Sequence, residues 1–63
     1  MPIIEVKAFD RRFDADQEKV EALIKGLTDA FAEVYGAEHR QETWVLLDGV
    51  SPMRWGFGGK LRA

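Results

Sequence analysis

The chain has 63 residues, a net charge of −2 and no cysteine, and these three properties exclude several classes of protein. Its length allows a single domain, residues 1–63. In a chain of this size the free energy gained by hydrophobic burial and the free energy lost by ordering the chain nearly cancel, at about 90 kcal/mol each. The lack of cysteine excludes disulfides and thiolate zinc sites, and His39, the one histidine, is a poor basis for another metal site. We therefore expect no metal, and we expect self-association to supply the missing stability.

The composition predicts a folded protein that binds neither nucleic acid nor a membrane. Hydrophobic residues make up 46% of the chain and charged residues 32%, unlike a disordered segment. The acidic balance argues against nucleic acid, whose binding needs a basic surface. The longest apolar run, Trp44–Leu47, is too short to span a membrane, and Met1–Glu5 lacks the features of a secretory signal. We expect a cytoplasmic protein.

The first half of the chain predicts a strand followed by an amphipathic helix. Ile3–Phe9 reads as the strand, and Asp10–Phe13 as a polar connection. Asp14 and Gln17 have the spacing of a capping box at the start of the helix, and Gly36 is placed to end it. The helix carries one apolar stripe, formed by Val20, Leu23, Ile24, Leu27, Phe31 and Val34.

The second half predicts a buried strand and a turn-rich tail. After the polar stretch Ala37–Glu42, the strand Thr43–Leu47 is apolar without alternation, so we expect both of its faces to be buried in a parallel sheet. The tail from Asp48 to Ala63 is rich in glycine and predicts a hairpin or turns, beginning with Asp48–Gly49. The fold class is therefore α/β, a single β-α-β unit with a C-terminal β-hairpin or turn segment. Its one helix covers one face of the sheet, which leaves the other face for a partner subunit.

Pro2 has the most informative chemistry in the sequence. The initiator methionine is readily trimmed before a small residue, and loss of Met1 would give Pro2 a free secondary amine. An α-amino group titrates near ~8, and burial in an apolar pocket lowers its pKa further, which suits a general base at neutral pH. A retained Met1 would instead make the Pro2 nitrogen an amide. His39 lies in a polar connection, where we expect it to be exposed.

Pro2 occurs together with several other features. The chain starts Met-Pro-Ile-Ile, Arg12 follows ten residues after Pro2, and Trp55–Lys60 reads Trp-Gly-Phe-Gly-Gly-Lys. In a β-α-β chain of this length, the combination resembles the 4-oxalocrotonate tautomerase family, in which the N-terminal proline is catalytic. The resemblance covers nearly the whole chain. It implies a cofactor-free isomerase that moves a proton between the enol and keto forms of a small, anionic, unsaturated 2-oxo acid.

The resemblance also implies roles for individual residues. Pro2 matches the general base, Arg12 the arginine that binds a substrate carboxylate, and Trp55 the apolar wall that helps to depress the proline pKa. The family's second arginine, in the second strand, is absent here because that strand begins Thr-Trp-Val. Arg40 and Arg54 are candidates to replace it, although both also fit solvated surface charge.

The family resemblance implies an assembly as well. Two β-α-β units would form a dimer with a four-stranded sheet covered by helices, and three dimers would form a hexamer. Active sites would then draw residues from neighbouring subunits. A homo-oligomer and an assembly with a related subunit that supplies the missing arginine both fit this pattern.

Two other interpretations of the chain stay open. Some members of the superfamily hydrate or dehalogenate unsaturated acids, with a protonated proline as the acid and usually a carboxylate that activates water. The sequence identifies no carboxylate for that role. The third interpretation is a non-catalytic oligomeric subunit, which a retained Met1 would favour.

Overall fold

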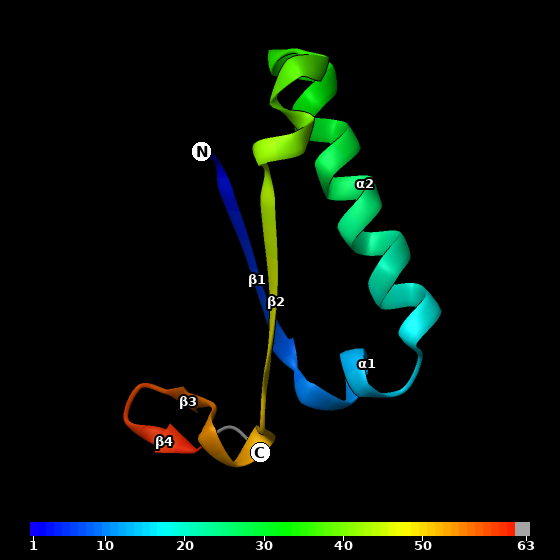
Figure 1. The fold of residues 1–63 in the computed structure, drawn as a ribbon. Coiled ribbons are helices and arrows are strands. Elements are labelled where there is room, and N and C mark those ends of the chain that lie inside the picture. The colour runs from blue at the N-terminus through cyan, green and yellow to red at the C-terminus, as the bar shows by residue number, and fades with distance from the viewer. Residues whose placement is uncertain (62–63) are drawn as a thin grey trace.

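A computed structural model describes residues 1–61 of the chain, so Arg62 and Ala63 of the predicted tail lie outside the described residues. The elements are strand β1 (Ile3–Phe9), helix α1 (Asp10–Asp14), helix α2 (Gln17–Tyr35), 3-10 helix η1 (Ala37–Glu42), strand β2 (Trp44–Val50), 3-10 helix η2 (Pro52–Arg54) and the short strands β3 (Gly56–Phe57) and β4 (Lys60–Leu61). Strands β1 and β2 pair in parallel, and β3 and β4 form an antiparallel hairpin (Figure 1). The structure confirms the α/β class, the β-α-β unit and the C-terminal hairpin.

The start of α2 differs from the prediction. The segment predicted as a polar connection forms α1, which ends at Asp14. Asp14 therefore does not cap α2. The cap is Asp16, whose carboxylate accepts a hydrogen bond of 3.0 Å from the Glu18 amide. At the other end Gly36 terminates α2, as predicted, with a φ of 120° that favours glycine.

Strand β2 is longer than predicted. It continues to Val50, so Asp48 and Gly49 form no turn. These two residues pair with Lys7 and Ala8 of β1, and the Lys7 ammonium donates a hydrogen bond of 2.9 Å to the Asp48 carboxylate. Partners from a distant strand thus override the local turn preference of the Asp-Gly pair.

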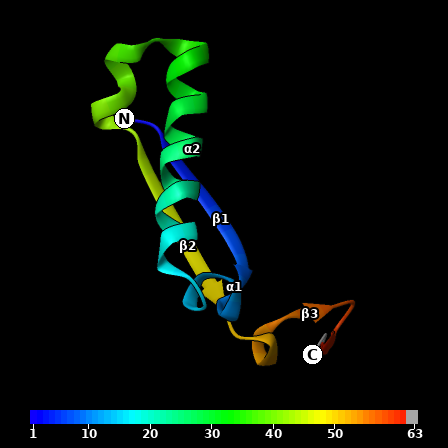
Figure 2. The ribbon, with the colours of Figure 1, turned by 90° about the vertical axis from the view of Figure 1, so that its right-hand side faces the viewer.

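The two faces of the β1–β2 sheet differ in what covers them. Helix α2 lies over one face (Figure 2), where side chains such as Ile4, Val6 and Val45 are half-buried. On the opposite face Ile3, Trp44 and Leu46 are 51%, 54% and 46% exposed. Helix α2 therefore covers one face of the sheet, as predicted, and burial of the other face by a partner subunit stays a prediction.

The chain is extended for its size. Its radius of gyration is 14.4 Å, against ~11 Å for a compact domain of this length. It exposes 5038 Å², about 900 Å² more than is usual for a compact monomer of 7.2 kDa. Among residues 1–61, Ala32 is the one apolar residue that is buried. The chain alone thus has almost no core.

Gly49 brings β2 close to the start of α1. A Cβ atom at this position would lie 2.8 Å from the Asp10 Cα atom, which is too close for either backbone to stay in place. We expect Gly49→Ala to destabilise the protein by about 1–3 kcal/mol, measured by urea denaturation. Gly26→Ala is the matched control, because a Cβ atom there meets nothing within 4 Å and alanine is favoured in a helix. An unchanged stability of Gly49→Ala would contradict the close approach.

Candidate active site

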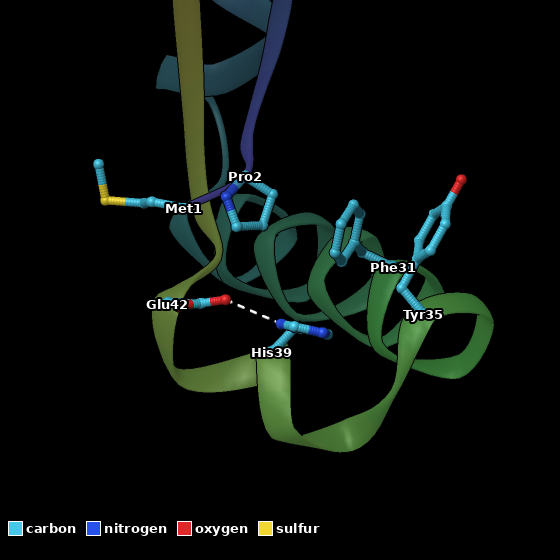
Figure 3. A pocket seen from close by; sticks show the side chains of 6 residues that line it. All are labelled: Met1, Pro2, Phe31, Tyr35, His39 and Glu42. Atoms are coloured by element: carbon cyan, nitrogen blue, oxygen red, sulfur yellow. Dashed lines mark hydrogen bonds and ion pairs between the residues drawn. The ribbon is translucent and has the colours of Figure 1, made fainter.

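A pocket lies beside Pro2, at the end of the sheet where β1 begins. It has a volume of about 390 Å³ and is shallow and widely open to solvent. Its lining residues come from the start of the chain, from the last turns of α2 and from η1; they are Met1, Pro2, Phe31, Tyr35, His39 and Glu42 (Figure 3). Strand β2 is joined to Pro2 as well, because the Trp44 amide donates a hydrogen bond of 3.0 Å to the Pro2 carbonyl.

Aromatic side chains form the α2 side of this pocket. Phe31 and Tyr35 are one helical turn apart, and their ring centroids lie 4.9 Å from each other. The sequence placed Phe31 in the apolar stripe of the helix, and the structure shows that the end of this stripe contributes to the pocket. An apolar wall of this kind disfavours charge on a neighbouring group.

Helix η1 forms the opposite, polar side of the pocket. It turns back after Gly36, and its backbone is held by hydrogen bonds from the His39 amide to the Gly36 carbonyl, 3.1 Å, and from the Thr43 hydroxyl to the His39 carbonyl, 2.7 Å. The Arg40 guanidinium pairs with Asp29 of α2 and ties η1 to that helix. These contacts fix the positions of His39 and Glu42, the two η1 residues that line the pocket.

His39 and Glu42 form a hydrogen-bonded pair within the pocket. The His39 Nδ1 and Glu42 Oε1 atoms are 2.8 Å apart. This hydrogen bond, and then the positive charge of the chain's amino terminus, lower the pKa of the Glu42 carboxyl. An ionised carboxylate can only accept, so Nδ1 carries the proton. His39 is also less exposed than predicted, with 40% of its side chain accessible, because η1 folds back toward Pro2.

Two of the other predicted site residues, Trp55 and Arg12, lie at the opposite end of the sheet. Trp55 packs against Phe9 with a centroid distance of 4.6 Å, and its indole N–H donates a hydrogen bond of 3.1 Å to the Val50 carbonyl. Arg12 lies on α1, beyond the carboxyl end of β1, and is exposed. Seven strand residues at ~3.3 Å each put roughly 20 Å between this end and Pro2. A single chain therefore does not bring Pro2, Arg12 and Trp55 together.

Comparison with known proteins gives a family match that begins at the same proline. The family model described as "Tautomerase enzyme" matches residues 2–63. The chain belongs to the tautomerase family. No curated protein and no solved structure matches it. The resemblance that rested on Pro2, Arg12 and the Trp-Gly-Phe-Gly-Gly-Lys segment is thereby confirmed at the level of the family.

The two remaining arginine candidates of this tautomerase lie in different places. Arg40 is on η1 next to the pocket, but its guanidinium is paired with Asp29 and does not line the cavity. Arg54 is exposed on η2, directly before Trp55. Neither guanidinium reaches the Pro2 pocket within one chain, so replacement of the missing strand arginine by either residue stays a prediction.

Sequence reasoning did not place Phe31, Tyr35, His39 and Glu42 near Pro2. These residues follow Pro2 by about thirty to forty positions, and only the return of α2 and η1 brings them back to it. The one available signal was Gly36, which marks where the helix ends and the chain reverses.

Within residues 1–61 the structure contains no helix long and apolar enough to cross a membrane.

Proposed function

We propose that this protein is a cofactor-free tautomerase that interconverts the enol and keto forms of a small, anionic, unsaturated 2-oxo acid. The general base is the Pro2 amine, which becomes free when Met1 is removed. The observation that carries the proposal is the family match, which starts at Pro2, together with the position of Pro2 in an open pocket with an aromatic wall.

The reaction needs one group that accepts and returns a proton. The neutral Pro2 amine takes the proton from the enol oxygen, the O–H electron pair forms the carbonyl, and the conjugated double bonds shift. The resulting ammonium then gives the proton to the conjugated carbon, which restores the neutral amine. Backbone amides or bound water stabilise the negative charge that develops on the oxygen. No oxidant, metal or cofactor enters this proton balance.

Neighbouring subunits complete the site in this proposal. Pro2 lies at one end of the β1–β2 sheet and Trp55 at the other, so residues from two chains must meet to make one pocket. Arg12 of a neighbouring chain binds the substrate carboxylate, and Trp55 of a neighbouring chain excludes water. We propose a homo-oligomer, a hexamer of three dimers, with an assembly that includes a related arginine-bearing subunit as the alternative.

Trp44 favours a substrate with one carboxylate. It begins the strand in which the prototype tautomerase carries its second arginine, and its backbone is hydrogen-bonded directly to Pro2. An indole offers an apolar surface and no charge to a second carboxylate. We therefore expect phenylenolpyruvate to be a better substrate than the dicarboxylate 2-hydroxymuconate.

A second candidate is hydration of an unsaturated acid, which Glu42 favours. Its carboxylate lies in the Pro2 pocket, where it is hydrogen-bonded to His39. An ionised carboxylate in this position can take a proton from water while a protonated Pro2 acts as the acid.

The experiment that tests the proposal has two parts. Intact mass spectrometry of the purified protein is expected to show the loss of one methionine. In a pH–rate profile, kcat/KM for ketonisation of phenylenolpyruvate is expected to rise with pH as the Pro2 amine loses its proton. Hydration of an unsaturated acid at a rate that falls as the amine loses its proton would instead support the hydratase, which needs a protonated proline. A retained Met1 would support the non-catalytic subunit.

A further inference from the structure

Glu42 is the one carboxylate among the six residues that line the Pro2 pocket. It lies across the pocket from the rings of Phe31 and Tyr35, and its carboxylate is joined to His39 (Figure 3). Half of its side-chain surface is exposed, with an accessible fraction of 50%. Neither the sequence nor the family resemblance gave Glu42 a role in the tautomerase reaction.

The other groups around Pro2 carry little charge that could compete with Glu42. Strand β2 contributes the Trp44 backbone amide, and α2 contributes the Phe31 ring and the Tyr35 phenol. On η1, the Arg40 cation is occupied by Asp29. His39 binds Glu42 through Nδ1, while its Nε2 atom lies 3.7 Å from the carboxylate of Glu38, which is not a lining residue.

Removal of Met1 moves the positive end of the chain onto Pro2, a residue that lines this pocket. With Met1 present, the amino terminus already contributes to the lowered pKa of Glu42, after the larger effect of the His39 hydrogen bond. Attraction between two charges is mutual, so the carboxylate that gains from a nearby ammonium also stabilises that ammonium. After processing, the ammonium is the Pro2 amine itself.

We propose that Glu42, held by His39, is a positioning residue for the Pro2 amine: its carboxylate stabilises the protonated amine and so determines the pH at which Pro2 becomes a base. This inference rests on the proposed function, since it requires the free amine of a processed chain. The aromatic wall lowers the pKa of the amine, and Glu42 raises it. The pocket thus contains two opposing influences on the catalytic group, one from α2 and one from η1.

The test compares the processed wild-type protein with Glu42→Gln. Glutamine keeps a carbonyl oxygen that can accept the His39 hydrogen bond, while the negative charge is lost. We expect the pKa of the Pro2 amine, followed by NMR titration of the ¹⁵N-labelled proline, to fall by about 0.5–1 unit, because the charge is close but half-exposed. Well below this pKa, kcat/KM for phenylenolpyruvate should rise about three- to tenfold, and well above it should not change.

Glu38→Gln is the matched control, since it removes the same charge from the same helix but outside the pocket lining. It should leave the Pro2 titration unchanged. High salt should shrink the difference between wild type and Glu42→Gln. A merely structural role of Glu42 would lower kcat/KM at every pH instead of raising it in acid.

The outcomes separate this inference from the proposed function. An unchanged or raised Pro2 pKa in Glu42→Gln, with ketonisation still dependent on Pro2, would overturn only the role of Glu42. A retained Met1, or ketonisation that does not depend on Pro2, would overturn the proposed function and this inference with it.

Discussion

Replacement of Pro2 by alanine is expected to lower kcat for ketonisation of phenylenolpyruvate by about 10²–10⁴-fold, the usual contribution of a general base. The alanine variant still has an amino terminus in the same place. Its primary amine is more strongly hydrated, and it can rotate, whereas the proline ring holds the lone pair in one direction. Stopped-flow absorbance of the enol measures the loss directly.

An extended amino terminus is the control for this prediction. Insertion of one alanine between Met1 and Pro2 keeps the proline ring and its hydrogen bond to Trp44, but makes the proline nitrogen an amide. This variant should fold and assemble like the wild type and show a comparable or larger loss of rate. Ketonisation at the wild-type rate in either variant would show that the Pro2 amine is not the base.

Leu46→Glu is expected to prevent assembly and, with it, activity. Leu46 lies between Trp44 and Asp48 on the sheet face that α2 leaves uncovered, and it is 46% exposed in the single chain. Full burial of a leucine contributes about 1.5–3 kcal/mol, and a buried, unpaired carboxylate costs far more. Because this change is repeated in every subunit, we expect monomers, measured by sedimentation velocity.

The loss of activity in Leu46→Glu tests whether the site is shared. Pro2 and its own Trp55 are at opposite ends of one sheet, so a monomer should be inactive even where Met1 has been removed. Ala22→Glu is the control, because it adds the same charge at an exposed position of α2. An active, monomeric Leu46→Glu variant would contradict a site made from two subunits.

The sequence predicted those parts of the fold that depend on local patterns. The bounds of β1 and the end of α2 at Gly36 were correct, because alternation and a helix-terminating glycine are properties of the segment itself. The length of β2 was wrong, since Asp48 and Gly49 become strand residues only when Lys7 and Ala8 are beside them. The capping residue was misplaced because α1 was not foreseen, which left Asp14 as the apparent start of the long helix.

The site could be predicted from the sequence only in its chemistry. Pro2 stands out in the sequence because loss of Met1 would make it a terminal amine, whatever the fold around it. His39 and Glu42 have no such property, since a histidine and a glutamate in a polar stretch are ordinary surface residues. Their proximity to Pro2 depends on the angle at which the chain turns at Gly36, and that angle is a property of the three-dimensional structure.

The hydrogen bond between Trp44 and Pro2 joins two parts of the chain that are synthesised at different times. Strand β1 leaves the ribosome first, but it gains its partner only after Trp44 has emerged. If Met1 is removed during synthesis, as the proposed function requires, the enzyme that removes it acts on an end of the chain that has not yet paired with β2. Because the proposed base requires a free Pro2 amine, an affinity tag belongs at the carboxyl end: a tag fused before Pro2 would fold equally well but would keep the proline nitrogen an amide.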